Sequence, residues 1–356
     1  MPPIDTAKRI LQSYSGPPLR LMEVCGTHTH AIFRYGIRTL LPPSITLISG
    51  PGCPVCVTPT SYIDEAIYLA AHGVTLTTFG DLLRVPGTNG SLADARSRGA
   101  RIQIVYTPLD AVTYAAGHPA EPVAFLSVGF ETTTPASCLA VAEAQKQDLE
   151  NFTLLTANKT MDAAYLAMAD ACDAYLYPGH VCAITGARVP RALTEKGISG
   201  AVTGFTPSEL LTAIAAIAKN YQDAPKRPFF LNAYPRVVTE EGSPAAQRLL
   251  NTYMEPEDTE WRGLGILPQS GLRLRPAYAR YDARHIHHIP PQKGHPNPAC
   301  RCGDILRGAI TPPKCPLFRK TCTPDHPVGA CMVSREGTCA AWYQYISSLQ
   351  LLSAEK

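Results

Sequence analysis

The sequence has little charge and no long apolar segment. Only 17% of its 356 residues are charged, and the formal net charge is +3. This balance predicts no basic face, which argues against a nucleic-acid partner. Its longest apolar stretches, such as LLTAIAAIA, fall well short of the roughly 18 to 20 residues that span a bilayer. We therefore expect neither a nucleic-acid partner nor a membrane span.

Two further patterns are missing. The first residues, MPPIDTAKRILQSYSG, contain neither the apolar centre nor the cleavage site of a signal peptide, which predicts a cytoplasmic protein. The sequence also lacks the GxxxxGK[ST] phosphate loop, so nothing in it indicates a P-loop ATPase.

Cysteine, by contrast, is abundant. The chain has 12 cysteines, and in a long cytoplasmic protein these favour metal, cluster or redox-active thiols over structural disulfides. Three lie between residues 25 and 56, and six lie between residues 300 and 339. We expect the other three, Cys138, Cys172 and Cys182, to pack as small buried hydrophobes.

Apolar runs alternate with helical patterns over much of the chain, which predicts an α/β fold with largely parallel sheets. We expect two related α/β units that face a cleft, over residues 15–120 and 121–225. The third part, residues 226–356, is expected to be irregular and to bind an iron-sulfur cluster, and residues 1–14 can belong to it. Predicted strands are 19–24, 45–49, 74–79, 102–106, 123–128, 152–157, 174–177 and 200–203. Predicted helices are 7–14, 61–71, 136–147, 161–171, 339–352 and one that starts at the capping box of Thr206 and Glu209.

The motif CGTHTH, from Cys25 to His30, follows the first predicted strand. Sulfur and imidazole ligands together favour iron, zinc or copper over hard cations. A cysteine after a strand is most often a core residue, but His28 and His30 at alternate positions are costly to bury together. The motif therefore favours a functional site.

The segment GPGCPVC, from Gly50 to Cys56, contains a CxxC motif on a glycine-proline turn. Cys53 and Cys56 can form half of a zinc site or a dithiol that closes to a disulfide. In the zinc alternative, His28 and His30 would complete the ligand set. The spacing alone leaves both alternatives open.

Two other strand ends carry candidate polar residues. Glu131, in the segment GFETTTP at 129–135, can exchange a proton in a cleft, while its neighbouring threonines either bind a small polar group or cap the next helix. His180 follows a strand that ends in Pro178 and Gly179, a position better suited to a cleft than to packing.

The cysteine-rich tail is the strongest pattern. Its six cysteines exceed the four ligands that a zinc ion or a [4Fe-4S] cluster needs. One economical partition gives four cysteines to a [4Fe-4S] cluster, namely Cys300, Cys315, Cys322 and Cys339. It leaves Cys302 and Cys331 as a redox pair beside the cluster. A zinc knuckle is the alternative, although zinc fingers usually pair their ligands as CxxC and the tail has no CxxC.

These motifs together resemble the HypD family, which helps to build the iron centre of [NiFe] hydrogenases. The resemblance runs through nearly the whole chain and rests on CGTHTH, GPGCPVC, GFETTTP, PGHV at 178–181, WRGLG at 261–265 and the tail at 300–345. It implies an assembly scaffold with redox activity rather than a conventional turnover enzyme. On that scaffold, an iron ion acquires two cyanides and one carbon monoxide before insertion into the hydrogenase large subunit.

The resemblance also implies partners and roles. HypC, a small partner, shares the iron through its N-terminal cysteine, and HypE, which acts after HypF, delivers cyanide as a thiocyanate. Cys25 is then the expected iron ligand, His28 a nearby helper, and Cys53 with Cys56 a dithiol facing the same cleft. The family's [4Fe-4S] cluster and neighbouring disulfide correspond to the partition of the tail.

Release of cyanide from a thiocyanate needs two electrons, whereas a cluster passes one at a time, so a dithiol relay is a suitable intermediary. We predict that electrons pass from the cluster through Cys302 and Cys331 to Cys53 and Cys56. The alternative is a stand-alone thiol oxidoreductase that resembles ferredoxin:thioredoxin reductase, which would not need Cys25 or the histidines.

Overall fold

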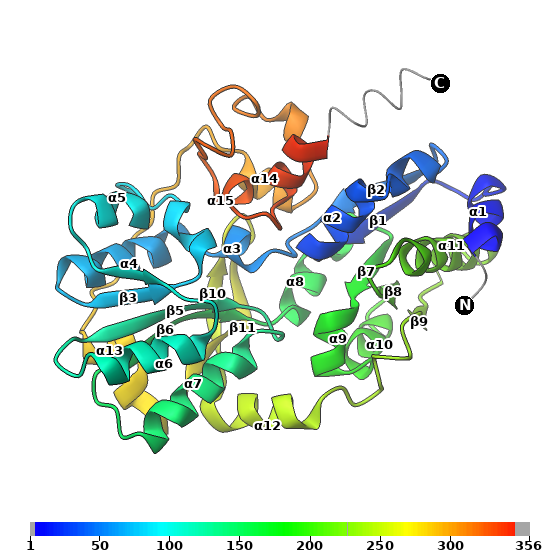
Figure 1. Cartoon of the computed structure of the whole chain (residues 1–356). Coiled ribbons are helices and arrows are strands. Elements are labelled where there is room, and N and C mark those ends of the chain that lie inside the picture. The colour runs from blue at the N-terminus through cyan, green and yellow to red at the C-terminus, as the bar shows by residue number, and fades with distance from the viewer. Residues whose placement is uncertain (1–3, 226, 346–356) are drawn as a thin grey trace.

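The computed structural model describes residues 4–225 and 227–345 and confirms an α/β fold (Figure 1). Sheet A has five parallel strands in the order β2 (Ile45–Ser49), β1 (Leu19–Glu23), β7 (Ala174–Pro178), β8 (Gly200–Thr203) and β9 (Phe230–Asn232). Sheet B has six strands in the order β10 (Met254–Trp261), β11 (Gly265–Leu274), β6 (Phe152–Lys159), β5 (Val123–Gly129), β3 (Thr75–Thr78) and β4 (Ile102–Ile104). All eight predicted strands are therefore present.

The two sheets do not follow the predicted successive units 15–120 and 121–225. Sheet A combines strands from residues 19–49 and 174–232, whereas sheet B combines strands from 75–159 and 254–274. The pairing of β1 with β7, in which Leu21 lies opposite Ala174, joins segments far apart in the sequence. Local apolar patterns identify such strands but not their partners.

Sheet B is mixed rather than parallel. Its strands β10 and β11 form an antiparallel hairpin, and β11 also pairs antiparallel with β6. Residues 230–274, predicted to belong to an irregular third part, thus contribute strands to both sheets.

Helices cover both faces of each sheet, as expected for this fold class. On sheet A, one face packs against α1 (Ile4–Gln12), α2 (Gly26–Arg34) and α11 (Pro207–Asp223). On sheet B, one face packs against α6 (Pro108–Gly117), α7 (Thr134–Lys146) and α12 (Pro244–Tyr253), and the other against α4 (Thr60–Ala71), α5 (Leu92–Ser97) and α13 (Ala283–Ile286). The predicted capping box starts α11, where the Thr206 hydroxyl accepts from the Glu209 backbone N–H.

The remaining core lies between the sheets and continues into the tail. It is built by α3 (Pro54–Val57), α8 (Asp162–Ala167), α9 (Gly179–Thr185), α10 (Arg188–Thr194), α14 (Cys302–Leu306) and α15 (Ala330–Val333), with Trp261 of the hairpin. Figure 1 shows the tail, in orange and red, above α3 and beside α2. The described residues also form 3-10 segments at Ile37–Leu40, Gly80–Arg84, Ala169–Ala171, Pro276–Tyr281 and Pro312–Lys314.

Residues 338–345 are helical, and the rest of the predicted helix 339–352 lies outside the described residues. Within the described ranges, no helix combines the length and the hydrophobicity that a membrane crossing requires.

Candidate functional site

Four loops meet at the carboxyl edge of sheet A. Because β1, β2, β7 and β8 are parallel, the segments that follow them lie at one edge, where open α/β sheets bind ligands. These segments carry Cys25, the GPGC turn, His180 and Phe205. The Cys25 Sγ lies 4.0 Å from the His180 Nε2. The structure therefore brings together residues that are 155 positions apart.

The motif CGTHTH starts a helix. Cys25 is the N-cap residue of α2, so His28 and His30 are two positions apart on a helix and point in different directions. The His28 Nε2 donates to the Gly204 carbonyl oxygen at 3.1 Å, and its ring lies 4.7 Å from that of Phe205. His30 instead contacts the ring of Tyr345 in the tail.

The zinc site suggested for Cys53, Cys56, His28 and His30 is not formed. Cys53 and Cys56 are joined by a disulfide, the second of the two alternatives. Within the described residues, no three His, Cys, Asp or Glu side chains are placed to hold a single metal ion.

The disulfide loop lies directly on the backbone of Cys25. The Gly26 N–H donates to the Gly52 carbonyl oxygen at 3.2 Å. A Cβ on Gly52 would lie 2.0 Å from the Cys25 nitrogen, so no other residue fits there without a shift. At the far end of the loop, Cys53 caps α3 by accepting from the Cys56 N–H.

Burial keeps Cys25, His28 and His180 uncharged near neutral pH. Burial raises the pKa of Cys25 to about 12 and lowers that of His180 to about 4. Burial and the nearby His180 together lower the pKa of His28 to about 3. A protonated thiol therefore faces a neutral imidazole across 4.0 Å.

Glu131 belongs to the other sheet. It follows β5 in sheet B, and its Oε1 accepts from the Met161 N–H at 2.8 Å. Burial, with the nearby Asp162 carboxylate, raises its pKa to about 8. The predicted threonine cap is also absent, because the N-cap residue Thr133 makes no side-chain capping bond to α7.

The six tail cysteines surround one pocket. Its other lining residues are glycine or apolar side chains: Ile305, Leu317, Phe318, Gly329 and Met332. The sulfur atoms of Cys302 and Cys331 are 2.7 Å apart, whereas the remaining four line the pocket around them. Cys302 and Cys331 are therefore in contact, and each also interacts with a neighbouring tail cysteine, Cys302 with Cys300 and Cys331 with Cys339.

Packing connects the Cys53–Cys56 disulfide with the cysteines of the tail. Helix α15, which carries Cys331, packs against α3, which carries Cys56. The WRGLG turn joins both groups, since the Arg262 N–H donates to the Val57 carbonyl at 2.7 Å. The same turn also touches the tail. A Cβ on Gly263 would lie 2.5 Å from the Cα of Gly303, the residue after Cys302.

Two residues of the site were not predicted. Glu23 is fully buried, accepts from the Thr29 hydroxyl at 2.6 Å and lies 3.4 Å from the Cys25 nitrogen. The sequence signal that could have identified Glu23 is its carboxylate within the otherwise apolar run LMEV. The Phe205 ring contacts the rings of both His28 and His180, and its position after β8 matches that of the other site loops.

Comparison with known proteins agrees with this arrangement. A family described as "HypD: Hydrogenase formation hypA family" matches residues 4–346. The chain belongs to the HypD family. Hydrogenase maturation factor HypD of Escherichia coli (strain K12) is 41% identical over 335 residues, which covers 92% of this chain and 89% of that protein. Hydrogenase maturation factor HypD of Azotobacter vinelandii is 43% identical over 342 residues, with the same coverage. Hydrogenase expression/formation protein HupD of Azotobacter chroococcum mcd 1 is 42% identical over 339 residues.

Proposed function

We propose that this HypD-family chain is a cytoplasmic scaffold for maturation of [NiFe] hydrogenases, on which iron acquires two cyanides and one carbon monoxide. Its relatives are named as hydrogenase maturation or formation proteins. The observation that carries the proposal is the packing of the Cys331 helix on the Cys56 helix, directly beside Cys25. This packing supports a relay of sulfur groups between the tail and Cys25.

In this proposal Cys25 holds the iron as a thiolate. Its thiol is protonated before iron binds, because burial raises its pKa to about 12. Iron displaces that proton to solvent, and the neutral His180 at 4.0 Å adds no positive charge that would oppose binding of the iron. His28 positions this face of the site through its bond to Gly204 and its contact with Phe205.

Cys53 and Cys56 act as the dithiol in cyanide transfer. A thiocyanate on the partner's cysteine loses cyanide when its S–C bond takes up two electrons. Oxidation of the two thiols to the disulfide supplies both electrons and two protons. The cyanide passes to the iron, one proton goes to the partner's thiolate, and the other goes to solvent. Exchange with the Cys302 and Cys331 thiols then reduces the disulfide again.

The tail fits a [4Fe-4S] cluster. Cys300, Cys315, Cys322 and Cys339 line one apolar pocket, and no charged side chain among the described residues lines it. Cluster ligands surround several iron atoms, so they need not converge on one point as the ligands of a single ion do. When bound, the cluster would supply single electrons to the Cys302–Cys331 pair.

The proposed partners follow from this chemistry. HypC contributes a second cysteine to the iron, HypE presents the thiocyanate made with HypF, and the hydrogenase large subunit receives the finished iron.

Infrared spectroscopy tests the proposal. The wild-type protein, purified with its small partner, should show bands of metal-bound cyanide and carbon monoxide, and Cys25→Ala should lose them. Absence of the bands in the wild type would favour the alternative, a thiol oxidoreductase. Cys53→Ala combined with Cys56→Ala should load iron without cyanide; unchanged cyanide loading would disprove the relay.

A further inference from the structure

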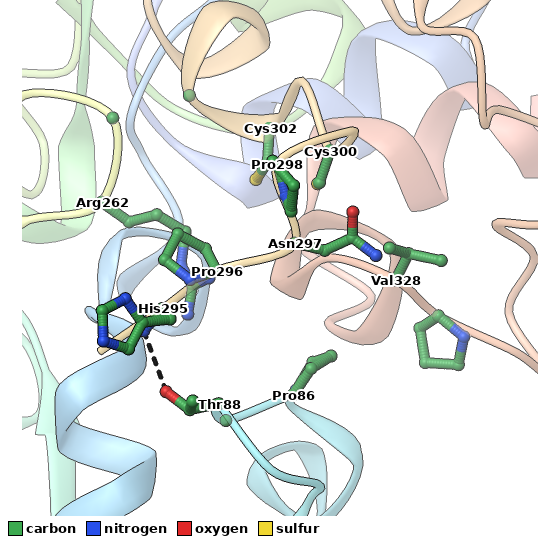
Figure 2. Close-up of a pocket in the computed structure, with 14 residues that line it drawn as sticks. Pro86, Thr88, Arg262, His295, Pro296, Asn297, Pro298, Cys300, Cys302 and Val328 are labelled. Atoms are coloured by element: carbon green, nitrogen blue, oxygen red, sulfur yellow. Dashed lines mark hydrogen bonds between the residues drawn. The ribbon is translucent and has the colours of Figure 1, made fainter. Parts of the chain in front are cut away.

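A cavity open to solvent lies beside the cysteine pocket of the tail. Its volume is about 780 Å³, and it is lined by residues 86–88, 262–263, 295–298, 300, 302, 303, 327 and 328 (Figure 2). In Figure 2, Cys300 and Cys302 lie together at one end and Thr88 at the other, bonded to the His295 backbone N–H. None of the residues assigned to the Cys25 site lines this cavity.

The cavity and the cysteine pocket share one wall. Among the described residues, Cys300 and Cys302 are the ones that line both spaces. Cys315, Cys322 and Cys339 line the cysteine pocket alone. Of the four proposed cluster ligands, Cys300 is therefore the one that faces the cavity, next to one member of the thiol pair.

The charge around the cavity is positive. Arg262 and His295 line it, whereas no carboxylate of the described residues does. Arg84 stands two residues before Pro86 and donates to the Pro324 carbonyl, and Lys293 lines the adjoining hollow. The nearby carboxylate of Asp64 is bonded to Thr88, and that of Asp304 is paired with Arg301 and Arg307.

The same bias extends over the tail. Residues 289–345 contain seven Lys and Arg but three Asp and Glu, whereas the whole chain contains 32 and 29. The tail thus has an excess of four positive charges, and the rest of the chain has an excess of one negative charge. The net positive charge of the protein is concentrated on the part that carries Cys300.

We propose that this face docks an acidic one-electron carrier protein, which delivers electrons at Cys300. The inference rests on the proposed function, because it assumes that Cys300 is a cluster ligand. Two reduced carriers are oxidised for each Cys302–Cys331 disulfide that becomes two thiols, and two protons come from solvent. Complementary charge speeds such encounters, which typically bury little surface.

Binding and electron transfer test the proposal with a plant-type [2Fe-2S] ferredoxin as the acidic probe. Calorimetry should detect binding at low ionic strength, and 0.5 M NaCl should abolish it. The variant Arg84→Glu with Lys293→Glu should bind about tenfold more weakly or worse, since steering by charge is worth ~10-fold or more. It should oxidise the reduced ferredoxin correspondingly more slowly, yet react with dithionite at the wild-type rate.

The matched control is Lys219→Glu with Arg248→Glu, which makes the same charge change on the exposed faces of α11 and α12. It should behave as the wild type. Equal binding by all three proteins, or equal loss in the control, would overturn the docking face. A wild type without iron-sulfur absorbance near ~400 nm would instead overturn the cluster, and with it the proposed function.

Discussion

At the residue scale, the candidate site depends on the close approach of two backbones. Gly52 has no Cβ, and this lets the GPGC turn lie on Cys25. The contact sets the distance between the proposed iron ligand and the proposed dithiol. A side chain at this point would separate them.

We predict that Gly52→Ala destabilises the protein by about 1–3 kcal/mol, the usual cost of adding a methyl group to a packed interior. The new Cβ would meet the Cys25 nitrogen and the Val24 carbonyl carbon, which are backbone atoms and cannot rotate away. Denaturant unfolding measures the change. Gly117→Ala is the control, because nothing lies within 4 Å of its Cβ position; an equal effect there would refute the explanation.

A second residue-scale prediction concerns Glu131. Burial raises its folded-state pKa from 4.5 to about 8, so the folded protein binds a proton that the unfolded chain releases across this window. Its contribution to stability is therefore highest near pH 4.5 and declines as the pH rises to 8, by ~1.4 kcal/mol per unit at most. Glu131→Gln should remove this slope from the free energy of unfolding.

The control for Glu131 is Glu195→Gln, a change at an exposed carboxylate. It should leave the pH dependence as in the wild type. If Glu131→Gln kept the wild-type slope between pH 5 and 8, the buried carboxyl would not be its source.

At the element scale, the short helix α3 is held in place by the WRGLG turn. The Arg262 Nε donates to the Thr58 carbonyl at 2.9 Å, and its Nη1 donates to the Thr60 hydroxyl at 3.1 Å. A four-residue helix has almost no stability of its own. The position of Cys56 against α15 therefore depends on these bonds.

We predict that Arg262→Gln lowers the free energy of unfolding by about 1.5–3 kcal/mol, the range for hydrogen bonds from a charged donor. Arg262→Lys should recover only part of the loss, because an ammonium cannot reproduce the geometry of the guanidinium. Arg248→Gln, on the exposed face of α12, is the control. A change of less than ~0.5 kcal/mol in Arg262→Gln would show that packing alone holds α3.

The sequence predicted the elements better than their pairing. Apolar runs such as VAFLSV identified strands because burial on both faces leaves a local pattern. Helix α2 was missed, since its first turn, Gly-Thr-His-Thr, has low helix propensity and is stabilised by tertiary contacts. The hairpin strand β10 was missed because MEPEDTEW is mostly polar and includes a proline, as edge strands can.

The candidate site was also predicted only where its residues leave a local pattern in the sequence. Cys25, His180 and the CxxC motif each follow a strand, a signal that is local. The separation of His28 from His30 depends on α2, and the position of Glu131 depends on its strand joining sheet B. Neither relation is visible in a local pattern.

At the scale of the whole molecule, the two sheets share one chain in an interleaved order. The strands of residues 19–49 pair with β7, while β3 and β4 join β5, so a cut near residue 120 divides both sheets. The central core between the sheets also contains side chains of the tail. Sheets, core and tail should therefore unfold together.

We predict that residues 1–120 and 121–356, expressed separately, do not fold, because the cut breaks the β1–β7 pair of sheet A and the β3–β5 pair of sheet B. Residues 1–120 would expose both β1 and β3 as unpaired edges, a known hazard for aggregation. Co-expression should restore a soluble complex with the circular dichroism spectrum and the single unfolding transition of the intact chain, which serves as the control. A soluble 1–120 fragment with dispersed amide resonances would contradict the interleaved fold, because it would show that the first part of the chain is a domain of its own.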